Sequence, residues 1–129
     1  MRASEDGLLS GAIVLIVEDN AILALDMITT LGNAGAAIVG PAHTLEHAVA
    51  LAKTEPISCG ILDVSLRNEA VFPAAELLRG RGVPIVFYTG HGDAEGLRRD
   101  WPEAQVLSKP APPKLLLQTV RNVCPTLAA

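Results

Sequence analysis

Five residues with reactive or metal-binding side chains each come directly after a short apolar run of the chain. They are a pair of neighbouring acids, a third acid, a hydroxyl and an amine: Glu18, Asp19, Asp63, Thr89 and Lys109. If these runs are parallel strands of one sheet, the five side chains meet at its carboxyl edge, where open parallel sheets bind their ligands. The spacing therefore predicts one site assembled from distant parts of the chain.

The expected site is rich in carboxylates and contains one cation. Three carboxylates in one pocket repel, so some must protonate or a hard cation must join them. Oxygen ligands with open positions suit Mg²⁺, which prefers one or two carboxylates together with a phosphate oxygen. A carboxylate is also a nucleophile that forms an aspartyl phosphate, and Lys109 and Thr89 would neutralise and orient the phosphoryl oxygens. The residues indicate phosphoryl transfer assisted by Mg²⁺.

Strands and helices alternate along the chain. Five uninterrupted apolar runs predict strands that are buried on both faces: 12–17, 37–40, 57–62, 83–88 and 105–107. Helical spacing and terminal residues predict helices in four segments between and after them: 21–34, 44–53, 71–79 and 113–123. This alternation, with right-handed crossovers, predicts an α/β fold, a doubly wound flavodoxin-like (βα)5 sandwich whose parallel sheet has the order 2-1-3-4-5.

The remaining segments are expected to be irregular. Residues 64–70 are expected to form a loop, and the glycines of segment 90–96 make it a poor helix former. Residues 1–10 are expected to be a flexible leader, residues 11–124 the folded domain and residues 125–129 a C-terminal tail.

Two helices have apolar patterns that bear on their surfaces. In the first helix Ile22, Leu25, Ile28 and Leu31 recur at helical spacing. In the last helix the three consecutive leucines 115–117 are too many for a single buried stripe, so one leucine is expected to face solvent.

Composition excludes several classes of protein. The 129 residues have the length of one domain, with no room left for a separate output domain. A net charge of −4 and an aromatic content of 3% count against a nucleic-acid reader, which needs a basic face and, for single strands, stacking aromatics. No apolar run approaches the ~20 residues of a membrane span, and the first ten residues lack a secretory signal. Cys59 is expected to be a buried hydrophobe in a reduced, cytoplasmic protein.

Four segments of the chain resemble the receiver domain of two-component response regulators, the CheY-like family. They are Val14-Leu-Ile-Val-Glu-Asp-Asn20, Ile61-Leu-Asp63, Phe87-Tyr-Thr-Gly90 and Leu107-Ser-Lys-Pro110. These segments have the family's order and spacing, and the resemblance extends over residues 11–124.

The resemblance implies a role for each site residue. Asp63 is the phosphoacceptor and a metal ligand, Asp19 binds Mg²⁺ directly, and Glu18 helps to bind it through water. The backbone carbonyl of Ser65 completes the protein ligands of the metal. Lys109 contacts the phosphoryl group.

The resemblance also bears on switching. It implies that Thr89 turns towards the phosphoryl group and that the Lys109–Pro110 peptide is cis. The position that usually holds a switch aromatic is Val106, so we expect the signal to pass instead through the glycine-rich segment after Thr89.

A narrower resemblance is to the stand-alone FATGUY-type receivers, which pair with HWE or HisKA2 histidine kinases. It rests on Val71-Phe-Pro-Ala-Ala and on the strand that ends in Phe87-Tyr-Thr-Gly90. Tyr88 replaces the alanine of that motif, and Ala111 follows Pro110 where an aromatic is usual.

The sequence therefore predicts a single-domain response regulator that takes a phosphoryl group from a histidine kinase or phosphotransfer protein onto Asp63 and then switches a protein-interaction surface. It would catalyse only its own phosphorylation and dephosphorylation, would bind no nucleic acid and would not insert into a membrane. One alternative is a pseudo-receiver, a binding module that takes no phosphate. The other is a phosphatase like the haloacid dehalogenases, although those carry the nucleophile on the first strand with a second Asp two positions later, where this chain has Ser65.

Overall fold

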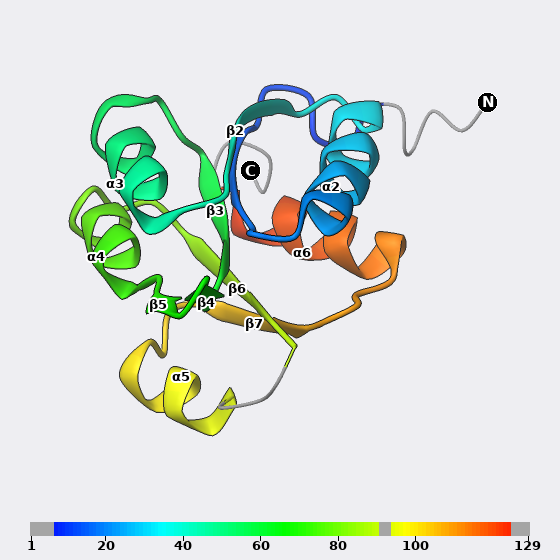
Figure 1. The fold of residues 1–129 in the computed structure, drawn as a ribbon. Helices are drawn as coiled ribbons and strands as arrows, with labels where there is room; N and C mark the ends of the chain where they lie inside the picture. Colours follow the sequence, from blue (N-terminus) through cyan, green and yellow to red (C-terminus); the bar gives the residue numbers. More distant parts are fainter. Residues whose placement is uncertain (1–6, 91–93, 125–129) are drawn as a thin grey trace.

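A five-stranded parallel sheet runs through the molecule, with helices on both of its faces (Figure 1). The computed structural model describes residues 7–90 and 94–124. The strand order β2-β1-β3-β6-β7 is the predicted order 2-1-3-4-5 when these five strands are numbered along the chain. The strands are β1 (Ile13–Val17), β2 (Ala37–Ala42), β3 (Cys59–Asp63), β6 (Ile85–Thr89) and β7 (Gln105–Ser108). The predicted doubly wound, flavodoxin-like fold is confirmed.

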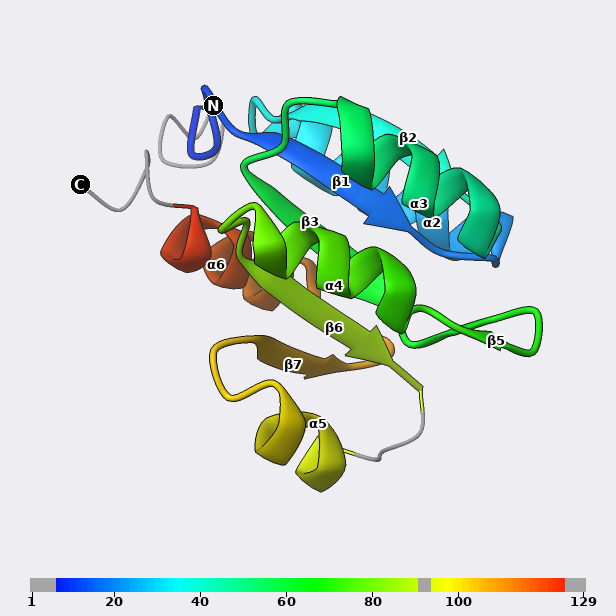
Figure 2. The same cartoon turned by 90° about the vertical axis from the view of Figure 1, so that its left-hand side faces the viewer.

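The helices divide between the two faces of the sheet (Figures 1 and 2). On one face lie α2 (Ala21–Asn33) and α6 (Pro113–Val123), and on the other lie α3 (Leu45–Thr54), α4 (Phe72–Gly80) and α5 (Ala94–Asp100).

The side chains of successive β1 residues point alternately to the two faces of the sheet. Val14 and Ile16 pack with α2 and α6, whereas Leu15 and Val17 belong to the other core layer. The uninterrupted apolar runs are therefore buried on both faces, as predicted.

Cap residues fix where the helices begin. The Asn20 side chain accepts hydrogen bonds from the amides of Ile22 and Leu23, so α2 starts immediately after Glu18 and Asp19. The Thr44 hydroxyl accepts a hydrogen bond from the His47 amide and caps α3. Strand β2 continues past the expected end at Gly40 to Ala42, with a register shift against β1.

Residues 64–70 form a small hairpin rather than the expected loop. Its strands β4 (Ser65–Leu66) and β5 (Glu69–Ala70) pair antiparallel around Arg67 and Asn68. Both turn residues have positive φ, 49° and 73°, as two-residue hairpin turns of the mirror-image type require. Figure 2 shows the hairpin extending beyond the carboxyl ends of the sheet strands.

Helix α5 forms in a segment that was expected to be a poor helix former. Gly96 lies inside it and is buried. Tertiary packing outweighs the low helix propensity of glycine, because Leu97 and the following Trp101 are buried against the sheet. The Trp101 ring lies 5.4 Å from Phe87 and 6.0 Å from Phe72 between centroids. Residues 91–93 lie outside the described residues.

The structure describes residues 7–10 of the segment that the sequence predicts to be a flexible leader. These residues form a turn in which Leu9 is fully buried, and the Leu9 amide donates a hydrogen bond of 2.8 Å to the Ala34 carbonyl. Leu9 packs in the core layer under α2 and α6. Residues 1–6 and the expected tail, 125–129, lie outside the described residues.

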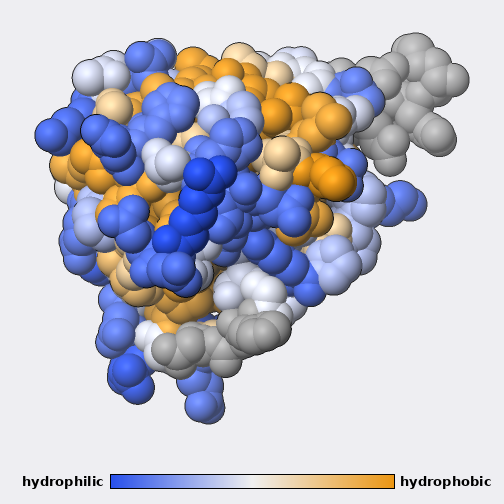
Figure 3. Space-filling model, in the orientation of Figure 1, coloured by the Kyte–Doolittle hydropathy of each residue, from blue (hydrophilic) through white to orange (hydrophobic). Residues whose placement is uncertain are grey.

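Helix α2 buries only part of the predicted apolar stripe: Leu31 lies in the core and Ile28 packs against it, but Ile22 and Leu25 do not. Ala24, Met27 and Leu31 are buried, whereas Ile22 is 73% exposed and Leu25 62% exposed. Apolar residues accordingly gather on the surface over α2 (Figure 3). Elsewhere the expectations for burial are confirmed: Cys59 is buried, and among the three consecutive leucines only the first, Leu115, faces solvent, at 47% exposure.

Within 7–90 and 94–124, no helix is both long enough and apolar enough to cross a membrane.

We predict that Leu9→Ala lowers the free energy of unfolding by about 2–5 kcal/mol, because it removes buried methyl groups and leaves a cavity. Urea unfolding measures this change. The matched control is Leu115→Ala, which truncates an exposed leucine and should stay within about 0.5 kcal/mol of the parent protein. A Leu9→Ala variant as stable as that control would show that the turn before β1 contributes nothing to the core.

Candidate functional site

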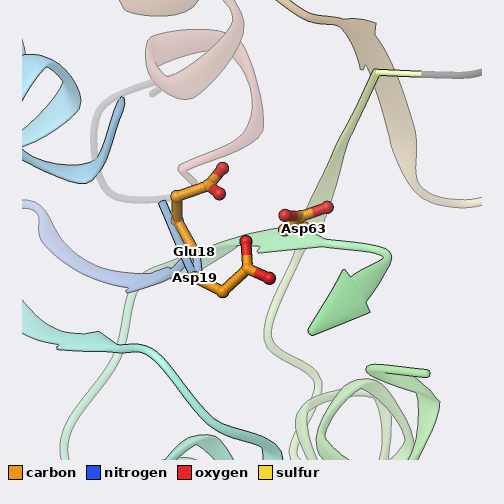
Figure 4. A group of neighbouring side chains, drawn as sticks. All are labelled: Glu18, Asp19 and Asp63. Carbon is orange, nitrogen blue, oxygen red and sulfur yellow. The ribbon is translucent and has the colours of Figure 1, made fainter. Parts of the chain in front are cut away.

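Three carboxylates meet at the carboxyl edge of the sheet because β1 and β3 are parallel neighbours. Val17 pairs with Leu62, so Glu18 and Asp19, which follow β1, lie beside Asp63, the last residue of β3. One carboxylate oxygen from each of the three lies within 4.8 Å of the others. Figure 4 shows the three side chains reaching into the same space from the ends of the two strands.

Lys109 is the cation of this cluster, as the sequence predicts. Its Nζ donates a hydrogen bond of 2.8 Å to Asp63 Oδ2 and lies 2.8 Å from Glu18 Oε1. Burial lowers the pKa of Lys109, but its contacts with Asp63 and Glu18 outweigh burial and raise the pKa above its ordinary value. The amine is therefore an ammonium ion that offsets part of the negative charge.

Glu18 is fully buried, and its two oxygens differ. Oε2 accepts a hydrogen bond of 3.0 Å from the Asn20 amide. Oε1 forms an ion pair of 2.8 Å with Lys109 Nζ, and no other group of the described ranges donates to it. Burial raises the pKa of the Glu18 carboxyl, against the opposing effect of Lys109. Within the described residues, Lys109 is therefore the one cationic partner that Oε1 has in the acidic cluster.

The β4–β5 hairpin contacts the other two acids through its backbone. Asp19 Oδ2 accepts a hydrogen bond of 3.0 Å from the Arg67 amide. The Ser65 amide lies 3.4 Å from Asp63 Oδ1, at the long limit of a hydrogen bond. Both Asp19 and Asp63 are thereby held by residues that come directly after β3.

Thr89 lies at the same edge of the sheet as the acids. It is the half-buried last residue of β6, and its carbonyl accepts a hydrogen bond of 2.9 Å from the Lys109 amide. The Lys109–Pro110 peptide is cis, as the resemblance implied. The structure thus brings all five strand-end residues of the sequence prediction to one edge, with Ser65 beside them.

Several neighbours of the site were missed by sequence reasoning. The amides of Asn20 and Arg67 act through the backbone, which carries no signal of residue type. The His43 ring donates from Nδ1 to the Glu18 carbonyl at 2.8 Å, since a carbonyl can only accept. The Tyr88 side chain contacts the loop after β7, and its departure from the motif was the one available signal.

The donor set fits a hard divalent cation. The clustered ligands are carboxylate oxygens, and among the described residues no histidine or cysteine joins them, so soft-metal chemistry is not indicated. Three carboxylates share the one ammonium of Lys109, and Asp19 has no cationic side chain beside it in the described ranges. The cluster therefore keeps negative charge for a further cation to offset. Residues Glu18, Asp19 and Asp63 therefore suit Mg²⁺.

Comparison with known proteins gives a consistent answer. A family model described as the response regulator receiver domain matches residues 14–121. The transcriptional regulatory protein PdtaR of Mycobacterium tuberculosis is 33% identical over 87 residues, which are 67% of this chain and 42% of PdtaR. The chain thus spans less than half the length of this curated relative.

Solved structures share the fold. A response regulator receiver protein from Sinorhizobium medicae superposes with a TM-score of 0.79 at 25% identity, covering 88% of this chain and 94% of that one. A CheY-like receiver domain protein from Methanospirillum hungatei superposes with a TM-score of 0.80 at 19% identity, covering 91% and 96%. The family match spans nearly all of the described sheet, and the acidic residues and the lysine of the chain meet at one edge of that sheet. The chain therefore belongs to the response regulator receiver domain family.

Proposed function

We propose that this chain acts as a response regulator receiver that accepts a phosphoryl group on Asp63 from a histidine kinase or phosphotransfer protein. The observation that carries the proposal is the contact of 2.8 Å between Lys109 Nζ and Asp63 Oδ2, beside two further carboxylates. An acid at the end of a central strand, paired with one ammonium and otherwise surrounded by negative charge, suits a nucleophile that works with a cation.

In the proposed reaction an Asp63 carboxylate oxygen attacks the phosphorus of phosphohistidine. A P–O bond forms, the P–N bond of the donor breaks, and its electron pair returns to the imidazole nitrogen. Lys109 moves from pairing the carboxylate to pairing a phosphoryl oxygen, and the Thr89 hydroxyl donates to another. In the proposed dephosphorylation, water attacks the phosphorus, the Asp63 oxygen leaves as carboxylate, and inorganic phosphate is released.

Mg²⁺ is the cofactor of this proposal. Asp19, Asp63 and the Ser65 carbonyl would hold it, with Glu18 acting through water. When bound, Mg²⁺ supplies positive charge that neutralises the phosphoryl oxygens. Asp19 follows β1 and Asp63 ends β3, so the spacing of these two strands sets the distance between the two carboxylates that would hold the metal.

We propose that the exposed apolar side of α2 is where the phosphodonor protein docks. Ile22 and Leu25 are three residues apart, which places them on one side of the helix. The helix starts directly after Glu18 and Asp19, so this surface borders the acidic cluster. A donor histidine must enter that cluster, and an adjoining apolar surface would bind the rest of its protein.

The donor is proposed to be a histidine kinase of the HWE or HisKA2 type. Support comes from the resemblance of Val71-Phe-Pro-Ala-Ala and Phe87-Tyr-Thr-Gly90 to the FATGUY motifs. A phosphotransfer profile against the histidine kinases of the source organism distinguishes this type from others.

Asp63→Asn is expected to abolish labelling by a kinase and by acetyl phosphate, because the amide lacks the nucleophilic oxygen of a carboxylate. Radiolabel incorporation measures it. Asp100→Asn, a change at an exposed acid of α5, is the control and should label like the parent. Undiminished labelling of Asp63→Asn would refute the assignment, and a parent protein without labelling or Mg²⁺ affinity would point to a pseudo-receiver.

Asp19→Asn should stabilise the protein in chelator by about 1 kcal/mol or more, since like charges ~4 Å apart repel by that amount even in water. Mg²⁺ should raise the thermal midpoint of this variant less than that of the parent. A ligand that binds only the folded state stabilises it more strongly the tighter it binds, and the variant has lost a metal ligand. Thermal unfolding with and without Mg²⁺ measures both effects, again with Asp100→Asn as control. An unchanged response to Mg²⁺ would contradict the proposed ligand.

Ile22→Asp should slow phosphotransfer from the kinase about tenfold or more, because it places a charge in the centre of the apolar contact. Labelling by acetyl phosphate should be unchanged, since no protein docks. Leu115→Asp is the matched control, because it also puts an acid in the first turn of a helix at an exposed apolar position, where an acid is tolerated. Equal rates for Ile22→Asp and the parent would place donor docking elsewhere.

A further inference from the structure

Tyr88 lies in β6, next to the candidate site. Its side chain points to the opposite face of the sheet from that of the preceding residue, Phe87. The Tyr88 backbone pairs with Asp63 on one flank and with Leu107 on the other. Phe87 belongs to the core layer of α3, α4 and α5, whereas Tyr88, 4% exposed, belongs to the layer of α2 and α6. The tyrosine ring thus lies beneath the point where the chain passes from β7 into α6.

Both ends of the tyrosine side chain contact that connection. The Tyr88 hydroxyl accepts a hydrogen bond of 3.2 Å from the Ala111 amide. The centroid of its ring lies 5.5 Å from Lys109 Nζ, within the range of a cation–π contact. One side chain therefore touches the ammonium of the site and the backbone two residues further along the chain.

The lysine needs such support because a long, flexible side chain must hold its ammonium within hydrogen-bond distance of Asp63. Strand β7 ends at Ser108, so Lys109 lies just beyond the sheet. Its amide is held by the Thr89 carbonyl at 2.9 Å, and its stem runs close to Gly90, where an added Cβ would lie 3.7 Å from Lys109 Cδ. The bond from Ala111 to Tyr88 adds a second backbone attachment on the other side of Lys109.

The Tyr88 ring also lines a groove of about 420 Å³ between α2 and the start of α6. Met27 and Leu116 form other parts of its wall, and Pro110 and Ala111 lie at the same groove. The side chain that contacts Lys109 thus also lines a groove that borders α2.

We propose that Tyr88 is a positioning residue for phosphoryl transfer: through its hydroxyl bond to Ala111 and its ring beside Lys109, it holds the ammonium against Asp63. This inference rests on the proposed function of Asp63. The backbone of Tyr88 pairs with Asp63, whereas its side chain acts through its contacts with Ala111 and Lys109. Its alanine counterpart in the FATGUY motif has neither a ring nor a hydroxyl, so the device belongs to this chain.

The test is Tyr88→Phe, which removes the hydroxyl and keeps the ring. At saturating Mg²⁺, the maximal rate of Asp63 labelling should fall about tenfold, within what a displacement of ~1 Å costs a catalytic group. The acetyl phosphate concentration that gives half of the maximal rate should change less than twofold, and the Mg²⁺ dissociation constant should stay the same. We expect both quantities to be preserved because Tyr88→Phe leaves the three carboxylates of the site unchanged.

Ser58→Ala is the matched control. It removes a hydrogen bond of the same kind, from the Ile13 amide to a side-chain hydroxyl at 2.9 Å, at the opposite end of the sheet. It should lower stability by a similar amount and leave the labelling rate unchanged. Equal rates for Tyr88→Phe and the parent, or equal losses in both variants, would overturn the inference.

A double-mutant cycle separates positioning from general destabilisation. In a Lys109→Ala background, Tyr88→Phe should have no further effect on the remaining rate, because the group that it positions is gone. A further tenfold loss there would overturn the inference. Asp63→Asn measured in parallel tests the proposed function separately: labelling that survives this change refutes the function, whereas labelling lost in Asp63→Asn but intact in Tyr88→Phe refutes only the role of the tyrosine.

Discussion

The main constraint on this structure is that three carboxylates, which repel one another, must be held in one pocket with a single ammonium. Glu18, Asp19 and Asp63 place an oxygen each within 4.8 Å of one another, and Lys109 pairs with two of the three. An arrangement of this kind lowers the stability of the folded chain unless a further cation offsets the charge, which is the condition under which a metal ion binds. The parallel sheet, the caps and the hairpin all serve to hold these charges together.

Much of the site could be predicted because its residues stand where buried strands end. An uninterrupted apolar run specifies a strand covered on both faces, and parallel pairing then brings Asp63 beside Glu18 and Lys109 however far apart they are in the sequence. The last helix was predicted to its observed bounds, Pro113–Val123, since proline sets its start. These features follow from local chemistry combined with one rule of topology.

Other features depend on tertiary contacts that periodicity does not contain. Periodicity marks Ile22 and Leu25 for burial in the first helix, but the core takes the small Ala24 and the flexible Met27 instead and leaves the two bulkier residues exposed. Helix α5 forms because Trp101 packs against Phe87, despite glycine at position 96. The hairpin contacts the site through the Arg67 amide, a group that every residue except proline possesses.

The central claim is that the phosphoryl group is carried on Asp63 as an acyl phosphate. Borohydride reduction converts an aspartyl phosphate to homoserine, which peptide mass spectrometry locates in the chain. We expect homoserine at position 63 only after incubation with Mg²⁺ and a phosphodonor. Homoserine at another acid, or its absence from a protein that has taken up phosphate, would contradict it.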